Sequence, residues 1–387
     1  MEKVKILLIG IGGYGTNYIK EMTEKTVTSA EIAGICEVMP DVLERFPVIA
    51  KKQIPLYKTP EAFYEEHQAD LAVISTPIHL HYQQITVCLQ NGSHVLTEKP
   101  VCTTLEETTR LLELERETGR FVSVGYQLNY SRDVLAMKQD ILNGKFGEPL
   151  LMKALHAMAR GANYYSRNNW AGKIRVNGCQ VNDSPFNNAC AHQFQNMSFV
   201  LGDAMDRAAE FKTVEAELYR ANRSVENFDT VALKAVTGSG IPVYYYTTHA
   251  LEQKKLGPVS EYIFENATIY FGRDFGDGAV MEYEVEWNDG RREFYGGIPK
   301  GERLQKLYDA IDCVRGGGHP VCTIQCAVPH LEVVNALMKL PVHQIREEEL
   351  EHVTAEGDGF CRIRGLKDIF TTCYEKNQMP SQTGVHW

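Results

Sequence analysis

Residues 4–15, VKILLIGIGGYG, decide the fold of the N-terminal third of this chain. The apolar run 4–9 leads directly into Gly10-Ile11-Gly12-Gly13-Tyr14-Gly15, a G-x-G-x-x-G turn that opens a predicted helix. Glu37 closes the second apolar run, roughly 20 positions after the turn, where dinucleotide-binding folds place an acidic residue. A strand, a glycine turn, a helix and an acidic residue in this order predict a dinucleotide-binding unit.

Each residue of this motif has its own expected role. We expect Gly10 to permit the tight turn, Gly12 to admit a diphosphate, and Gly15 to let the helix pack closely on the strand. The helix N-terminus would offer N–H groups to the phosphates, and Glu37 would accept hydrogen bonds from the ribose, which favours NAD over NADP. The expected cofactor contacts here are Gly10, Gly12, Gly13, Tyr14, Gly15 and Glu37. A glycine-rich turn without a ligand, beside a surface glutamate, is the alternative.

The chain alternates apolar runs with amphipathic stretches over its first 120 or so residues, a pattern typical of a parallel sheet with crossover helices. Predicted strands cover 4–9, 31–36, 71–75, 94–97 and 121–125, and predicted helices cover 14–24, 81–90 and 105–118. Longer β-rich stretches follow at 150–160, 213–220, 230–237 and 243–250, with helices at 189–201, 304–314 and 325–340. The predicted fold is α/β: a Rossmann doubly wound parallel sheet in 1–125, then an α+β domain with a large, mostly antiparallel open sheet in 126–387. The second domain would bind substrate and form oligomers, and its C-terminal helix could pack back on the first.

Composition and charge narrow the possible partners. A net charge of -10 and a pI near 5.7 argue against nucleic acid and anionic membranes, so we expect a small-molecule partner. The sequence shows neither a membrane-length apolar run nor a secretory leader, and its ten cysteines form no C-x-x-C pair. We therefore expect a cytoplasmic protein with reduced thiols and no metal site; the spacing of Cys322 and Cys326 is only a weak zinc signal.

Two further segments follow strand ends, where open α/β sheets bind ligands. Ser75-Thr76-Pro77 follows the third predicted strand, and Glu98-Lys99-Pro100 follows the fourth. His79 could contact a cofactor or cap the next helix, and these two roles stay open; for His81, capping and packing is the favoured role.

With the glycine turn, these segments and Val124-Gly125-Tyr126-Gln127, the chain resembles the Gfo/Idh/MocA family of oxidoreductases, which includes glucose-fructose oxidoreductase and inositol dehydrogenase. The resemblance extends to Gly318-His319-Pro320-Val321-Cys322-Thr323 near the C-terminus. It implies an NAD-dependent dehydrogenase of sugar-like substrates, a dimer or tetramer, and Lys99 beside the nicotinamide and the reacting carbon. An ammonium there could stabilise charge on the substrate oxygen. The further cofactor contacts expected are Ser75, Thr76, Pro77, His79, Glu98, Lys99 and Gln127.

The second domain departs from the family pattern. Family members carry Asp and His four residues apart after a glycine-rich stretch; here His192 matches the histidine, but Asn188 stands at the aspartate position. We expect both side chains on one helical face, with His192 as general acid or base and Asn188 orienting substrate without relaying a proton. A buried, satisfied histidine and a helix-capping asparagine are the alternatives. We expect Lys99 and His192 to converge on one face of the nicotinamide ring.

An aromatic and polar cluster over 164–170 precedes this site. Aromatic faces with forked donors suit a sugar ring, or a sugar carboxylate or phosphate. A packed loop is an equally good interpretation. The expected substrate contacts are Lys99, Tyr165, Arg167, Asn168, Trp170, Asp183, Asn188 and His192.

Three functions fit these residues. The leading one is reversible oxidation of a secondary hydroxyl on a sugar, cyclitol or sugar derivative, with NAD carrying the hydride. The second is glycoside cleavage through transient oxidation and elimination, for which the unusual Asn188 leaves room. The third is a non-catalytic dinucleotide-binding regulator, which the presence of Lys99 and His192 disfavours.

Overall fold

The computed structural model describes residues 2–25, 27–273, 281–297, 303–385 and 387. The chain divides into two compact units. The first holds Met1–Tyr130 and Pro299–Val328, and the second holds Ser131–Ile298 and Pro329–Trp387. Among the described residues, no helix has both the length and the apolar character that crossing a membrane requires.

The first unit is built on a six-stranded parallel sheet with the strand order β3-β2-β1-β4-β5-β6. Its strands are β1 (Val4–Ile9), β2 (Ala30–Cys36), β3 (Leu56–Tyr57), β4 (Leu71–Ile74), β5 (His94–Thr97) and β6 (Val122–Val124). All four residues of β4 are buried, as expected for a strand covered on both faces. This doubly wound order confirms the predicted Rossmann fold.

Helices and short helical turns connect these strands. They are α1 (Gly15–Glu24), α2 (Val42–Arg45), α3 (Val48–Lys51), α4 (Pro60–Glu66), η1 (Ile78–Leu80), α5 (His81–Gln90), α6 (Leu105–Thr118), η2 (Gln127–Tyr130), α10 (Gln305–Asp312) and η3 (Cys313–Gly317). The sequence explains the ends of α6: a Thr104–Glu107 capping box begins it, and Gly119 with a φ of 64° ends it.

The second unit is built on a nine-stranded sheet with the order β16-β15-β14-β13-β7-β12-β11-β10-β17. Its strands are β7 (Pro149–Met158), β10 (Phe211–Arg220), β11 (Thr230–Thr237), β12 (Pro242–Thr248), β13 (Lys255–Phe264), β14 (Ala267–Phe271), β15 (Glu282–Trp287), β16 (Arg292–Gly297) and β17 (Val342–Gln344). Most neighbours are antiparallel, but β7 runs parallel to β12 and β10 runs parallel to β17. The large, mostly antiparallel sheet expected from the sequence is confirmed.

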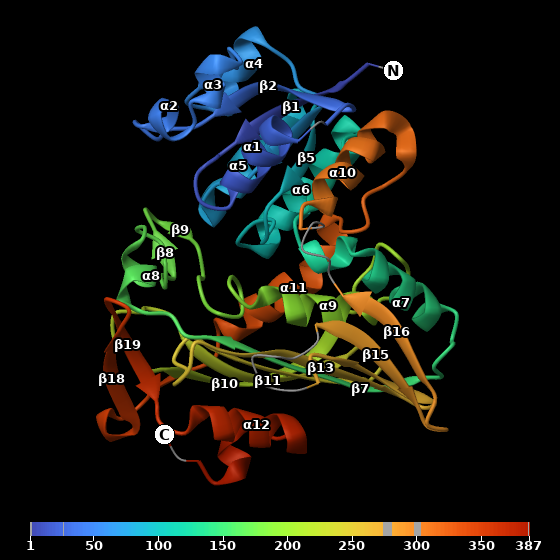
Figure 1. The fold of residues 1–387 in the computed structure, drawn as a ribbon, viewed down its shortest axis with the longest axis vertical. Helices are drawn as coiled ribbons and strands as arrows, with labels where there is room; N and C mark the ends of the chain where they lie inside the picture. Colours follow the sequence, from blue (N-terminus) through green and yellow to red (C-terminus); the bar gives the residue numbers. More distant parts are fainter. Residues whose placement is uncertain (1, 26, 274–280, 298–302, 386) are drawn as a thin grey trace. The chain divides into compact units, whose positions relative to one another are not determined.

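Two hairpins and several helices complete this unit. They are β8 (Arg175–Val176) with β9 (Cys179–Gln180), β18 (Leu350–Ala355) with β19 (Asp358–Ile363), α7 (Arg132–Leu142), α8 (Ala162–Ser166), α9 (Ala191–Val200), η4 (Glu347–Glu349), α12 (Leu366–Lys376), η5 (Pro380–Thr383) and the part of α11 (Ile324–Leu337) that begins at Pro329. Helices α9 and α12 lie on opposite faces of the large sheet (Figure 1).

The observed units differ from the expected division at residue 125. The segment that carries α10 belongs to the first unit although it follows the strands of the second in sequence. The physical reason is burial: Leu304, Leu307, Ala310 and Ile311 join the apolar core formed with β1 and α1. The C-terminal helix α12 instead packs within the second unit, against β7 and β12.

Candidate active site

The glycine turn between β1 and α1 approaches the end of β4 very closely. A Cβ on Gly10, whose φ is 78°, would lie 2.8 Å from Thr76 Cγ2 and 2.9 Å from the Ser75 carbonyl oxygen. A Cβ on Gly15 would lie 2.1 Å from the Gly10 carbonyl oxygen. Only residues without a side chain allow this turn to pack so tightly.

The N-terminus of α1 is suited to an anionic group. Its N-cap residue, Tyr14, makes no side-chain capping bond, and no acidic residue stands in the first turn. A Cβ on Gly13 would have no neighbour within 4 Å, and within the described residues no acceptor is recorded for the N–H groups of Gly13 and Tyr14. The turn therefore has both the open space and the donors that a diphosphate needs.

Glu37 is fixed beside this turn at the end of β2. One carboxylate oxygen accepts hydrogen bonds from the N–H groups of Ile11 (2.9 Å) and Gly12 (3.2 Å). The other accepts from the N–H groups of Val38 (2.8 Å) and Met39 (3.1 Å). This anchoring holds an acidic group next to the glycine turn, where the sequence predicted a ribose contact.

The two histidines after β4 have different surroundings. In η1, His79 has a buried Nδ1 with no hydrogen-bond partner in the described part of the chain, and burial lowers its pKa. His81 is buried, with Nδ1 2.8 Å from the Pro100 carbonyl oxygen and Nε2 3.0 Å from the Thr76 carbonyl oxygen. His81 thus connects the two motif loops, whereas His79 keeps a ring nitrogen that a ligand could use.

Glu98, one of the expected cofactor contacts, has two partners within the first unit. Its Oε1 accepts a hydrogen bond from the Tyr18 hydroxyl (2.6 Å) and forms an ion pair with Lys306 of α10. The Lys306 side chain is 1% exposed, and its ammonium also donates to the Gly125 carbonyl oxygen at 3.2 Å. No sequence motif indicated Lys306, because the pair joins positions that are far apart along the chain.

Lys99 follows Glu98 and is partly buried. Gln127, the last expected cofactor contact, lies in η2, where its Oε1 accepts from the Tyr14 hydroxyl at 3.4 Å. The first unit therefore brings the glycine turn into contact with the Ser75-Thr76-Pro77 segment, Glu37 and Gln127, all after the carboxyl ends of parallel strands.

In the second unit, a buried carboxylate holds Asn188. Asp183 Oδ1 accepts from Asn188 Nδ2 at 2.8 Å, and Asp183 Oδ2 accepts from the Gly172 N–H at 2.7 Å. The helix expected over 189–201 begins only at Ala191, so His192 lies in its first turn while Asn188 lies in the preceding turn. That turn is closed by the Cys190 N–H, which donates to the Pro185 carbonyl oxygen at 2.9 Å.

The cluster over 164–170 combines stacking with local hydrogen bonds. The Arg167 guanidinium carbon lies 3.5 Å from the centroid of the Tyr164 ring and 5.2 Å from that of Trp170. Asn168 Oδ1 accepts from the N–H groups of Trp170 and Ala171, so this oxygen shapes its own loop. The Tyr165 hydroxyl oxygen lies 3.0 Å from Nδ1 of the buried His249.

The hairpin β18–β19 contributes a residue that the sequence did not indicate. Asp358 Oδ1 accepts from the Asn163 N–H at 2.9 Å, at the start of α8. A Cβ on Gly161 would lie 2.2 Å from Asp358 Oδ2, so this glycine is needed for the contact. Asp358 therefore anchors the helix that carries Tyr164 and Tyr165.

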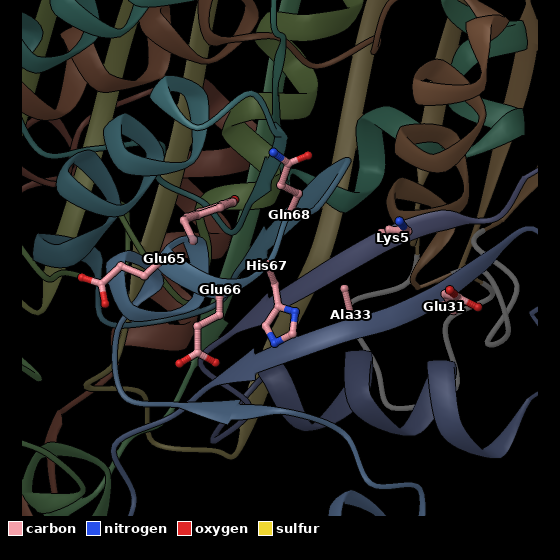
Figure 2. Close-up of a pocket in the computed structure, with 8 residues that line it drawn as sticks. Lys5, Glu31, Ala33, Glu65, Glu66, His67 and Gln68 are labelled. Carbon is pink, nitrogen blue, oxygen red and sulfur yellow. The ribbon is translucent and has the colours of Figure 1, made fainter.

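The pocket in Figure 2 lies elsewhere. It has a volume of about 580 Å³ and is lined by Lys5, Glu31, Ala33, Tyr64, Glu65, Glu66, His67 and Gln68. Lys5 and Glu31 stand at the amino ends of β1 and β2, whereas the candidate cofactor residues follow the carboxyl ends. Ligands of open α/β sheets bind at the carboxyl ends, so we assign this pocket no part in the site.

In the part of the chain that the structure describes, no three His, Cys, Asp or Glu side chains are grouped so that they could bind a metal ion. Cys322 and Cys326 are buried, and their sulfur atoms lie 3.4 and 3.7 Å from Asn129 Nδ2.

Comparison with known proteins identifies the class of the first unit. Residues 4–126 match the model of the oxidoreductase family with an NAD-binding Rossmann fold. Because this is the Gfo/Idh/MocA family model, the resemblance noted in the sequence is confirmed, and residues 4–126 form a Gfo/Idh/MocA-type NAD-binding domain.

Curated relatives are similar over part of their length. Inositol 2-dehydrogenase 1 of Saccharopolyspora erythraea is 22% identical over 211 residues, which is 54% of this chain and 58% of the relative. Inositol 2-dehydrogenase/D-chiro-inositol 3-dehydrogenase of Shouchella clausii is 25% identical over 164 residues, or 42% and 47%. The chain thus matches about half the length of these relatives.

Solved structures share the fold over almost the whole chain. The WlbA dehydrogenase of Bordetella pertussis, in complex with NADH and UDP-GlcNAcA, has a TM-score of 0.71 at 21% identity, covering 87% of this chain and 96% of that one. Aldose-aldose oxidoreductase of Caulobacter crescentus, complexed with glycerol, has a TM-score of 0.71 at 15% identity, covering 87% and 97%. At these identities the likeness establishes the architecture of both units.

Proposed function

We propose that this protein is an NAD-dependent oxidoreductase acting on a secondary hydroxyl of a sugar, cyclitol or sugar derivative. The observation that carries the proposal is the open glycine turn at the uncapped N-terminus of α1, beside the anchored Glu37. The curated relatives named as inositol dehydrogenases, and the related structure in complex with NADH and a sugar nucleotide, support it.

The residues of the first unit fit the cofactor. The N–H groups at Gly13 and Tyr14 would hold the diphosphate, and Glu37 would accept from the adenosine ribose. NAD, when bound, supplies the acceptor for the hydride. His79 Nδ1, buried and without a partner among the described residues, would be satisfied by a polar group of the same ligand.

The substrate's proton is handled by the protein. As the C–H bond gives its hydride to the cofactor, the hydroxyl oxygen loses a proton and becomes a carbonyl oxygen. His192 accepts this proton as general base, since an imidazole titrates near neutral pH. Lys99 stabilises the negative charge that develops on the oxygen. Asn188, held by Asp183, orients the substrate and carries no proton itself.

We further propose a cytoplasmic homodimer or homotetramer. All ten cysteines are thiols, as a reducing compartment would keep them. Light scattering on the eluted protein tests the oligomer: a mass of two or four chains supports it, and a single-chain mass contradicts it.

The activity is tested by incubating the purified protein with NAD and a panel of polyols, sugars and aryl glycosides. NADH absorbance and aglycone release are recorded together. NADH formation that Lys99→Ala abolishes, and that the exposed-lysine control Lys58→Ala leaves intact, supports the proposal. Aglycone release without net NADH identifies the glycosidase alternative instead. NAD binding without turnover of any panel member identifies a regulator.

A further inference from the structure

Two guanidinium groups stack on one phenol ring in the second unit. The Arg160 guanidinium carbon lies 4.6 Å from the centroid of the Tyr164 ring, and that of Arg167 lies 3.5 Å from it. Stacking leaves the edge N–H groups of a guanidinium available for hydrogen bonds, because it uses only the planar face.

Neither arginine is neutralised within the described residues. No ion pair with a carboxylate is found there for Arg160 or Arg167. Arg167 donates one hydrogen bond, to the Tyr164 carbonyl oxygen at 2.7 Å. One terminal nitrogen of Arg160 lies 3.8 Å from the Met158 sulfur, and the buried Nε has no hydrogen-bond partner among these residues. Two positive charges so close together are costly unless an anion joins them.

The acidic groups nearby are occupied by other donors. Asp183 accepts from Gly172 and Asn188, and Asp229 accepts from the N–H groups of Ala221 and Asn222. Both carboxylates are buried, and no ion pair joins either of them to Arg160 or Arg167 among the residues that the structure describes.

The buried His249 ring lies 5.3 Å from the Tyr164 ring on which the two arginines stack. His249 is 4% exposed, and its Nε2 has no hydrogen-bond partner among the described residues. Burial, followed by the charges of Arg160 and Arg167, holds the pKa of His249 well below its usual range. His249 thus adds polarity to the cluster without a third positive charge.

The cluster lies beside the expected substrate residues. Gly172, whose N–H binds Asp183, packs against Tyr165, since a Cβ there would be 3.0 Å from the Tyr165 ring. Asp183 in turn holds Asn188. The Coulombic influence of Asp183 also raises the pKa of Tyr164, after the larger effect of burial.

We propose that Arg160 and Arg167 bind an anionic group of the substrate, a carboxylate or a phosphate, so that the enzyme acts on an acidic sugar derivative rather than a neutral sugar. This rests on the proposed function, because it assigns the charge of the substrate whose hydroxyl is oxidised. A planar carboxylate or a phosphate matches the forked donors of arginine in two parallel hydrogen bonds.

The test measures binding separately from turnover. NAD-loaded protein is titrated calorimetrically with D-glucuronate, D-glucose 6-phosphate and D-glucose, which share a ring and differ in charge. We expect one anionic compound to bind about tenfold or more tightly than glucose, a difference of the size that charge-assisted bidentate pairs provide. The stronger of the two anions distinguishes a carboxylate site from a phosphate site.

Substitutions of the two arginines test whether they cause the preference for an anionic ligand. Arg167→Gln and Arg160→Gln should each reduce the preferred anion's affinity about tenfold, Arg167→Lys should reduce it less, and exposed Arg175→Gln should not change it. Circular dichroism shows whether each variant is folded. Because Arg167 is exposed, Arg167→Gln should fold, so it still tests the inference if Arg160→Gln does not fold. Equal binding of glucose and both anions, no binding of any of them, or unchanged anion affinity in folded Arg167→Gln overturns the inference.

Measuring NADH formation as well as binding distinguishes a failure of this inference from a failure of the proposed function. If NADH forms only from neutral members of the panel, the dehydrogenase proposal stands and the anionic substrate is wrong. If anions bind through Arg167 but no panel member yields NADH, the anion site stands and the dehydrogenase proposal fails.

Discussion

Asn188 Nδ2 donates a 2.8 Å hydrogen bond to the buried carboxylate of Asp183. Position 188, where the family pattern has an aspartate, thus carries an amide that is hydrogen-bonded to a neighbouring buried carboxylate. Because the amide nitrogen faces Asp183, the amide oxygen faces the other way, which gives Asn188 a fixed orientation.

Substituting Asp183 tests this arrangement. Asp183→Asn should lower kcat by about tenfold or more, which is the usual effect of removing a residue that orients an active-site group without contacting the substrate. The affinity for NAD should stay unchanged. The readouts are steady-state kinetics and NAD titration. A drop in NAD affinity that equals the loss of kcat would show general unfolding instead.

Asn188→Asp should place two carboxyl groups against each other in a buried site. One of them would then hold its proton to a higher pH than in the unfolded chain, because adjacent like charges are disfavoured. Relative to the wild type, the variant should lose stability as pH rises through the ordinary aspartate range, and recover it below that range. Chemical denaturation at several pH values measures this; a pH-independent difference contradicts it.

Because Lys306 and Glu98 form an ion pair, we expect substitutions of the two residues to have strongly non-additive effects on the free energy of unfolding. Lys306→Met should destabilise the first unit by about 3–5 kcal/mol, because it leaves the Glu98 carboxylate, whose side chain is only 13% exposed, without its cationic partner. The double variant with Glu98→Gln should recover much of that loss. Exposed Lys20→Met serves as the control in urea unfolding. Additive losses in the double variant would mean that the two residues act independently.

Two glycines of the first turn should respond differently to alanine. In Gly10→Ala the new Cβ meets Thr76 and Ser75 below 3.0 Å, so folding itself should suffer. In Gly13→Ala it enters open space, so the cost should be about 1 kcal/mol for the left-handed conformation. NAD affinity should nevertheless fall in Gly13→Ala, because the methyl group occupies the diphosphate approach. Thermal unfolding measures the effect on stability, and NAD titration measures the effect on binding. Unchanged NAD affinity in folded Gly13→Ala would contradict the assignment of the glycine turn as the diphosphate-binding site.

The pH dependence of stability should contain a contribution from Glu115. Burial raises the pKa of this carboxyl from 4.5 to about 7, partly offset by its hydrogen bond from the Val122 N–H. A raised folded-state pKa means that the native chain holds the proton longer, so this group's stabilisation falls as pH rises from about 4.5 to 7. Glu115→Gln should remove that decline from the unfolding free energy; an identical pH profile in the variant contradicts it.

Asp358 should act on substrate binding through α8. Asp358→Ala removes the acceptor of the Asn163 N–H, at a cost of about 1 kcal/mol typical of a lost helix cap. We expect a higher KM for the sugar substrate, with the affinity for NAD unchanged. Exposed Asp203→Ala is the control. An unchanged KM would show that the hairpin contact has no part in substrate binding.

The sequence predicted the elements whose patterns are local. The fully apolar strand β4 and the glycine turn before α1 identify a parallel sheet without any tertiary information. The strands β13 to β16 were missed, because their outer face carries charged and aromatic residues. Glu261, Tyr270 and Glu284, for example, stand in register on neighbouring strands and weaken the apolar signal.

Sequence patterns predicted only those residues of the candidate site that belong to a short, contiguous motif. Lys306 and Asp358 reach their partners through folding, across separations that no spacing rule covers. The start of α9 at Ala191 was likewise missed, because the preceding turn is closed by a backbone bond rather than by a residue with a strong capping preference.

The most direct test of the proposed chemistry is a double-mutant cycle on Lys99 and His192, measured as single-turnover NADH formation with the best substrate of the panel. If both groups act on the same hydroxyl, Lys99→Ala with His192→Gln should lose little more activity than the more damaging single change, as for residues that act as a unit. If the two losses multiply, or if either single variant keeps full turnover, the two residues do not share one proton-transfer step.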